Sequence, residues 1–88
     1  MFRVDWLQSA LDELTNIWLA AESVERAAIT VASHAIEQQL RASPQDEGES
    51  RPGGRRITFI APLAVRFRVE ADGQTVTVLQ VRMFRRRR

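Results

Sequence analysis

The segment LAVRFRVEADGQTVTVLQV, residues 63–81, constrains the fold of this chain more than any other feature. Apolar and polar residues alternate on both sides of a central Asp72-Gly73 pair. Successive side chains of a strand point to opposite faces of a sheet, so the alternation predicts two strands that each bury one face. Asp-Gly is typical of a two-residue hairpin turn, which makes the two strands antiparallel neighbours. The turn sets a register with these cross-strand pairs: Val69–Val76, Phe67–Val78, Arg68–Thr77 and Arg66–Leu79.

Two amphipathic helices are predicted upstream of this hairpin, and they are expected to cover its apolar face. Asp5 is the candidate N-cap of the first helix, and Ser23 is the candidate N-cap of the second. Both segments repeat apolar residues at helical spacing. The first stripe consists of Leu7, Ala10, Leu11, Leu14, Ile17 and Trp18, and the second of Val24, Ala28, Val31, Ala32, Ala35, Ile36 and Leu40. Because the gap between the helices is short, they are expected to form an antiparallel hairpin.

Three further segments complete the expected architecture. FRV at residues 2–4 and RRITFI at residues 55–60 are candidate strands, and Pro62 separates the latter from the strand that follows. Residues 42–54 gather Pro, Gly, Ser and acidic residues, which predicts an exposed loop. The predicted fold is α+β: an antiparallel β-sheet with an N-terminal helix hairpin packed on one face, in the order β-α-α-β-β-β. With 88 residues, the chain is expected to form a single domain over residues 1–88.

Charge is divided unevenly along the chain. Residues 1–50 hold three arginines against nine acidic residues, a net charge of −6, whereas residues 51–88 hold ten arginines against two acidic residues, a net charge of +8. The basic half ends in a tail of four arginines at residues 85–88. This asymmetry predicts that the second half contacts a polyanion or an acidic protein.

Composition argues against several classes of protein. The chain has no cysteine, so a disulfide framework and a thiolate metal site are excluded. No apolar run reaches the roughly 18–20 residues that a membrane span requires, and a cytoplasmic location is expected. His34 is the one histidine and falls in the second predicted helix, so no metal and no cofactor are expected.

The polar face of the predicted hairpin carries the candidate site. Arg66, Arg68 and Glu70 share this face. Arginine binds phosphate and carboxylate groups well but is a poor proton carrier, because its pKa lies above about 12. Glu70 is therefore the candidate catalytic base; the alternative is an ion pair with Arg68 at the end of the hairpin, opposite Thr75. The aromatic residues on or beside the buried stripes are expected in the core, namely Trp6, Trp18, Phe59 and Phe67.

Three stretches match a known family in order and spacing: VDWLQSALDELTNIW, AAITVASHAIEQQL with the Pro/Gly loop after it, and GGRRITF with PLAVRFRVEADGQTVTVLQV. Over residues 2–83 the chain resembles the RelE/ParE toxins of bacterial toxin–antitoxin pairs. The resemblance implies a compact toxin that is neutralised by an antitoxin wrapped around it. We expect that antitoxin to contribute an acidic, partly disordered segment, because the second half of this chain is basic.

The resemblance implies one of two targets. RelE-like members cut mRNA in the ribosomal A site, whereas ParE-like members poison DNA gyrase and have no known active site of their own. In either case, five basic residues are expected to contact the target: Arg56, Arg66, Arg68, Arg82 and Arg85. The chain has no lysine and no tyrosine, and Ala64 stands where the family places a basic residue early in this strand.

These departures favour a ParE-like gyrase inhibitor that acts by binding. A ribosome-dependent mRNA endonuclease, with Glu70 as its base, is the first alternative. An inactive relative that only binds an acidic partner or nucleic acid is the second. Whether the chain forms a homodimer stays open at this stage.

Overall fold

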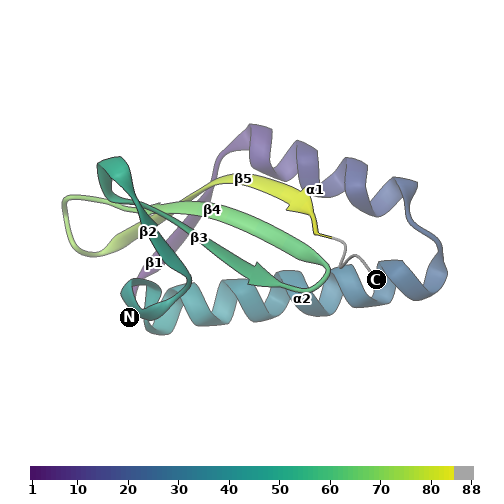
Figure 1. Ribbon diagram of the computed structural model, residues 1–88, viewed down its shortest axis with the longest axis horizontal. Coiled ribbons are helices and arrows are strands. Elements are labelled where there is room, and N and C mark those ends of the chain that lie inside the picture. Colours follow the sequence, from purple (N-terminus) through teal and green to yellow (C-terminus); the bar gives the residue numbers. More distant parts are fainter. Residues whose placement is uncertain (85–88) are drawn as a thin grey trace.

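The computed structural model describes residues 1–84, which form two α-helices and one five-stranded sheet (Figure 1). The strands lie in the order β1-β5-β4-β3-β2. Their bounds are β1 Arg3–Trp6, β2 Glu49–Arg51, β3 Arg55–Ile60, β4 Leu63–Val69 and β5 Thr75–Met83. The helices are α1 Gln8–Ala20 and α2 Ser23–Ala42, and two 3-10 turns flank β2, at η1 Pro44–Asp46 and η2 Pro52–Gly54. No helix in this part of the chain is long and apolar enough to cross a membrane.

The sheet is mixed rather than antiparallel. The strands from β2 to β5 are antiparallel to their neighbours, as predicted, but β1 pairs in parallel with β5. The expected short strand near the N-terminus is therefore present, and its expected direction is wrong. A strand of four residues with mixed burial carries no pattern that identifies the direction of its partner, so this orientation is not encoded locally.

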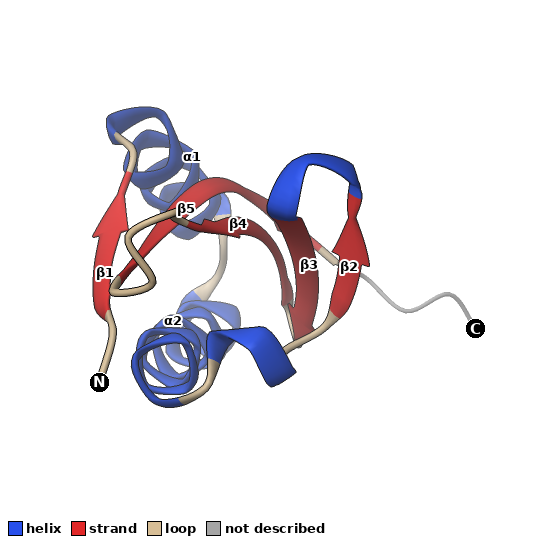
Figure 2. Ribbon diagram, turned by 90° about the vertical axis from the view of Figure 1, so that its left-hand side faces the viewer, coloured by secondary structure: helices blue, strands red, loops and turns tan. Residues whose placement is uncertain are grey.

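The two helices form the expected antiparallel hairpin. α2 lies under the concave side of the arched sheet, and α1 lies along β5 (Figure 2). Both helices contribute to one apolar cluster together with the inward-facing residues of β4 and β5. Its buried members are Ala10, Ala21, Ile29, Ala32, Ile36, Leu40, Leu63, Val65, Phe67, Val76, Val78 and Val81. The core thus lies on the helix side of the sheet, and the opposite side faces away from both helices.

The buried stripe of α2 differs from the predicted one. Ile29 is buried although it was not expected to be, whereas Val24 and Val31 are 86% and 70% exposed. The many alanines of this helix make two neighbouring stripes almost equally apolar. Helical periodicity alone therefore does not identify the stripe that faces the sheet.

Neither predicted N-cap is used. Asp5 lies inside β1, opposite Thr77 of β5. The N-cap residues are Leu7 for α1 and Glu22 for α2, and Ser23 is the first residue of α2. Neither N-cap residue makes a side-chain hydrogen bond to its helix. Pairing of β1 with β5 keeps the chain extended beyond the residue that cap preference favours.

The segment expected to be an exposed loop, residues 42–54, contains an edge strand. β2 occupies residues 49–51; these are exposed, as predicted, yet they pair with β3. Pro44, in contrast, is buried. Gly48 has a φ angle of +65°, and a Cβ atom at this position would lie only 1.9 Å from the carbonyl oxygen of Ile57. The chain therefore enters β2 at a distance from β3 that only glycine permits.

The β4–β5 hairpin keeps the predicted register near its turn and departs from it at a bulge. Three predicted pairs are confirmed: Val69–Val76, Arg68–Thr77 and Phe67–Val78. Beyond a bulge at Arg66/Phe67, Arg66 faces Gln80 rather than Leu79. A bulge places two residues of one strand opposite one of the other, so every later pair shifts by one residue.

The hairpin turn is wider than predicted. The N–H of Glu70 donates to the carbonyl oxygen of Thr75 (2.8 Å), which leaves a loop of residues 71–74. Within this loop, Asp72 Oδ1 accepts the backbone N–H groups of Gln74 (2.8 Å) and Thr75 (2.9 Å), and Gly73 has a φ angle of +69°. The predicted two-residue turn is wrong because the Asp72 side chain stabilises the longer loop by bonding to its amides.

Candidate functional site

The candidate site lies on the side of the sheet that points away from the helices, which we call the open face. Its residues alternate with the buried residues of β3, β4 and β5 and face one another across the strands. They are Arg55, Ile57, Phe59, Ala64, Arg66, Arg68, Thr77, Gln80 and Arg82. The open face therefore brings together Arg66, Arg68 and Arg82, three of the five basic residues predicted to contact a target. Arg85 lies outside the described residues.

Arg56 does not belong to the open face. It is paired with the buried residue Phe67, so its side chain leaves β3 on the other side. There it donates to the carbonyl oxygens of Glu47 (2.8 Å) and Gly48 (3.2 Å) and to Ser50 Oγ (2.7 Å). These three bonds hold the segment before β2 against β3.

Arg55 takes the place on the open face that Arg56 was predicted to occupy. It lies opposite Arg68, beside the position of Arg66. A shift of one residue in a strand moves its side chains to the other face, and each phase of RRITFI begins with an arginine. The more apolar phase, with Ile57 and Phe59, is the one that faces outward, so the pattern favoured the wrong arginine.

Glu70 lies at the end of the open face in a tightly bonded arrangement. Its carboxylate accepts two hydrogen bonds from Arg68 Nε (3.1 and 3.3 Å) and one from Arg68 Nη2 (3.2 Å). It also accepts the hydroxyl of Thr77. The Thr77 hydroxyl first, and Arg68 second, lower the pKa of Glu70 below its ordinary value. The predicted ion pair with Arg68 is thus present, and the carboxylate is held in its ionised form.

Three arginines on or beside the open face have a carboxylate partner, one of them being Arg68 with Glu70. Arg82 pairs with Glu13 of α1, and Arg51 of β2 pairs with Glu49 (3.0 Å). The exceptions are two arginines whose side chains make no hydrogen bond and no ion pair within residues 1–84, namely Arg55 and Arg66. These two guanidinium groups are exposed and available to an anion.

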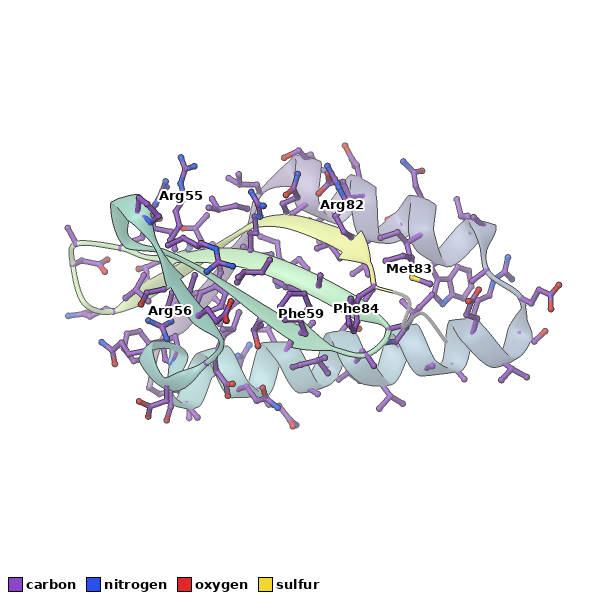
Figure 3. The ribbon with its side chains drawn as sticks, in the orientation of Figure 1. Arg55, Arg56, Phe59, Arg82, Met83 and Phe84 are labelled. Carbon is purple, nitrogen blue, oxygen red and sulfur yellow. The ribbon has the colours of Figure 1, made fainter. Side chains whose placement is uncertain are left out.

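A hollow of about 310 Å³ lies at the edge of the open face, beside β2. Its lining consists of Arg51, Pro52, Arg55, Arg56 and Arg66, from β2, η2, β3 and β4. Figure 3 shows Arg55 and Arg56 at the β2 end of the sheet, with Phe59, Arg82 and Phe84 toward the other end. The arginines that line the hollow are therefore gathered at the β2 end of the sheet, whereas Arg82 lies toward the other end.

Two phenylalanines form an exposed pair at the opposite end of the open face. The rings of Phe59 and Phe84 lie 5.0 Å apart at 53°, and the residues are 49% and 37% exposed. The prediction that Phe59 lies in the core is therefore wrong, for the same reason of strand phase that misplaced Arg56.

The other aromatic residues divide in the same way. Phe67 is fully buried, as predicted. Trp6 is half-buried, and its indole N–H donates to Glu37 Oε1 (2.9 Å). Trp18 is 39% exposed, which contradicts its predicted place in the core; the guanidinium of Arg26 covers its ring at 4.4 Å.

Residues 1–84 contain no group of three or more His, Cys, Asp or Glu side chains placed to hold a metal ion. His34 is exposed on α2, far from the open face in the fold. The chemistry that the described part of the open face offers is therefore that of guanidinium groups and one paired carboxylate. Guanidinium groups bind anions, and they do not exchange protons near neutral pH.

No protein-family model and no curated protein matches this sequence. Solved structures do match, and they show that the chain has the fold of the RelE/ParE toxins, as the sequence resemblance predicted. A chain of the chromosomal ParDE toxin–antitoxin system from P. aeruginosa is similar with a TM-score of 0.75 and 18% identity, over 97% of this chain and 98% of that one.

Two further structures extend the likeness to other toxins. The RelBE2 toxin–antitoxin complex from Mycobacterium tuberculosis has a TM-score of 0.70 and 14% identity, with 93% and 90% of the two chains covered. A YoeB/ParE toxin from Agrobacterium tumefaciens has a TM-score of 0.61 and 21% identity, with 96% and 100% covered. At these identities the likeness establishes the fold and leaves the target to be argued from the residues.

Proposed function

We propose that this chain is the toxin of a type II toxin–antitoxin pair, that it inhibits growth or stabilises a plasmid, and that it acts by binding its target. The target would be DNA gyrase in the cytoplasm, as for the ParE toxins that the chain resembles. The fold supports the first part of the proposal, because the likeness to ParDE and RelBE2 structures extends over nearly the whole of residues 1–88.

The state of Glu70 carries the second part of the proposal. Cleavage of RNA through its 2′-hydroxyl needs a proton acceptor, a proton donor and positive charge at the phosphate. Arginine supplies only the charge. Glu70 is bonded to Arg68 and Thr77, and its lowered pKa makes it a weaker proton acceptor than a free carboxylate. The described open face is thus suited to binding and poorly suited to proton transfer.

The arginines of the open face are also compatible with two alternatives to a gyrase inhibitor. An mRNA endonuclease would use them as phosphate clamps, with Glu70 as its base. An inactive relative would use them only to hold an acidic partner or nucleic acid. Both alternatives share the fold and the charge, so they are separated from the proposal by what the chain does to cells rather than by its shape.

The proposed neutralising partner is an antitoxin with an acidic segment that folds on this chain. The net charge of +8 on residues 51–88 gives such a segment an electrostatic reason to bind there. Structures with similar chains are of toxin–antitoxin complexes, ParDE and RelBE among them. Whether two copies of this chain also associate is a separate question, which sedimentation of the purified chain answers.

Pulse-labelling of DNA, RNA and protein synthesis in the minutes after induction in bacteria tests the proposal. DNA synthesis is expected to fall first, and the purified chain is expected to inhibit supercoiling by gyrase. If protein synthesis falls first instead, the endonuclease replaces the proposal. No change in any of the three, with folded protein present, identifies the inactive relative.

Exchange of Glu70→Gln provides the matching residue test. A binding toxin is expected to keep its effect on growth within about twofold, whereas loss of a catalytic base costs ~10²-fold or more in rate. Glu37→Gln is the control, because Glu37 is also paired with an arginine, Arg41, and lies on α2, on the helix side of the sheet. A large loss with Glu70→Gln alone would contradict action by binding.

A further inference from the structure

The hollow at the β2 end of the sheet gathers more positive charge than its surroundings neutralise. Four arginines line it, and the one carboxylate paired with any of them is Glu49, within residues 1–84. Arg55 and Arg66 have no partner in this part of the chain. Like charges held this close repel one another, so a bound anion would relieve the repulsion.

The shape of the hollow favours a polyatomic anion. Its volume of about 310 Å³ is far more than one water molecule or one monatomic ion needs. Its walls are partly fixed before any ligand arrives. Arg51 is held by Glu49 (3.0 Å), and Pro52 restricts the turn beside it. A prearranged site spends less free energy on ordering its side chains.

The arrangement of the arginines favours phosphate over carboxylate. In this chain one carboxylate pairs with one guanidinium group, as Glu70 does with Arg68 and Glu49 with Arg51. A phosphate group has more oxygens, carries up to two negative charges, and accepts hydrogen bonds from several directions. The arginines of the hollow come from three strands and so approach from several directions.

We propose that this hollow is a phosphate-binding site, in which Arg55 and Arg66 are the principal ligands and Arg51 and Arg56 complete the lining. The phosphate can belong to a nucleic-acid backbone or to a free nucleotide or polyphosphate, since both present the same oxygens. The site would exist whether the chain is a gyrase inhibitor, a nuclease or neither. Its failure would therefore leave the proposed toxin function untouched.

Calorimetric titration of the full chain with pyrophosphate at low salt tests the site. The double variant Arg55→Gln/Arg66→Gln is expected to bind pyrophosphate at least about tenfold more weakly for each arginine removed. The control is Arg3→Gln/Arg41→Gln, which removes the same charge from β1 and α2. The control pair is expected to change the affinity by no more than about threefold, through general screening alone.

Thermal unfolding checks that the double variant is folded and gives a second readout. Because Arg55 and Arg66 are exposed and unpartnered within residues 1–84, their exchange is expected to leave the unfolding midpoint unchanged or slightly raised. Pyrophosphate is expected to raise the midpoint of the wild-type chain and of the control pair, and to leave that of the double variant unchanged.

Competition with a single-stranded oligonucleotide identifies the source of the phosphate. An oligonucleotide that displaces pyrophosphate, with a salt slope that Arg55→Gln/Arg66→Gln reduces by about 1.4, shows a nucleic-acid backbone in the hollow. Pyrophosphate binding without this competition shows a free nucleotide or polyphosphate. Both outcomes support the phosphate site.

Three other outcomes would overturn it. Equal weakening by the double variant and the control pair would show diffuse attraction rather than a site. Binding of a glutamate-rich peptide in place of pyrophosphate, lost in the double variant, would show that the hollow serves an acidic protein. No heat and no shift in unfolding midpoint with either probe would show that the hollow binds neither.

Discussion

Gly48 shows how closely the path of this chain depends on single residues. Its φ angle of +65° is one that other residues rarely adopt, and its Cα faces the backbone of β3. The carbonyl oxygen of Gly48 also accepts a hydrogen bond from Arg56, so the same residue helps to hold the segment before β2 against β3. The placement of the edge strand therefore depends on one position without a side chain.

Exchange of Gly48→Ala is expected to lower the free energy of unfolding by about 2–3 kcal/mol, because it adds both backbone strain and a clash with Ile57. Gly73→Ala is the matched control: its φ angle of +69° is similar, but nothing lies within 4 Å of the added Cβ. The control is expected to cost about 1 kcal/mol. Urea denaturation measures both values, and equal losses would contradict the close approach described here.

The residue scale is also where the sequence was least informative about the site. Arg66 and Arg68 could be assigned to one face because strict alternation fixes the phase of β4. Arg82 shares that face only because of the bulge, since alternation counted from Thr77 would place it on the buried side. Arg55, Arg56 and Phe59 could not be assigned in this way, because Ile57 and Phe59 are more apolar than Thr58 and Ile60 and yet face outward. What separates the two phases is pairing with β4, a contact that no local pattern contains.

At the scale of elements, carboxylates join segments that the apolar core does not reach. Glu13 of α1 accepts the backbone N–H of Val81 and a bond from Arg82, so it ties the helix to β5 beyond the end of β1. At the turn of the β4–β5 hairpin, Glu70 accepts a hydrogen bond from the Thr77 hydroxyl, and Asp72 accepts one from the backbone N–H of Gln74. Hydrophobic periodicity predicted these helices and strands well. It contained no information about the hydrogen bonds between them, the bulge in the β4–β5 hairpin or the direction of β1.

The hydrogen bonds of these carboxylates predict that the free energy of unfolding decreases in acid. For Glu13, partial burial raises the pKa, but the Val81 N–H and Arg82 outweigh it, so the pKa lies below its ordinary value of 4.5. The Thr77 hydroxyl and Arg68 lower the pKa of Glu70, and the backbone N–H of Gln74 lowers that of Asp72. Groups of this kind stabilise the fold above their unfolded pKa, and the stabilisation is lost as pH falls through the folded pKa.

The free energy of unfolding is therefore expected to be constant from pH 7 to about 5.5 and to fall below about pH 4.5. Urea denaturation at a series of pH values measures this. Glu13→Gln is expected to start less stable and to lose less on acidification, because it takes up one proton fewer. Val31→Ala is the control; it changes no titratable group and is expected to follow the wild-type slope. A Glu13→Gln curve parallel to wild type would contradict the role of this carboxylate.

At the scale of the whole molecule, one apolar cluster joins both helices to the sheet. Ala10, Ile36 and Phe67 come from three different elements and are all fully buried in that cluster. Neither the hairpin of helices nor the sheet has a second core of its own among the described residues. The helices and strands are therefore expected to unfold together.

Ile36→Ala is expected to lower the free energy of unfolding by about 3 kcal/mol, through lost burial and the cavity it leaves. Val31→Ala is the control on the same helix; this side chain is 70% exposed and is expected to change stability by less than about 0.5 kcal/mol. Circular dichroism and tryptophan fluorescence are expected to report the same transition in both variants. Separate transitions for helices and sheet would contradict a shared core.

The division of charge along the sequence becomes a division in space. The helix hairpin, residues 8–42, holds five acidic residues against two arginines, whereas the open face holds four arginines. The helix side of the molecule is thus negative, and the open face of the sheet is positive. In the electric field of a polyanion, a protein with this charge distribution rotates as it approaches, so that the open face of its sheet makes the first contact. Its speed of encounter, more than the strength of the final complex, depends on keeping the two charges apart.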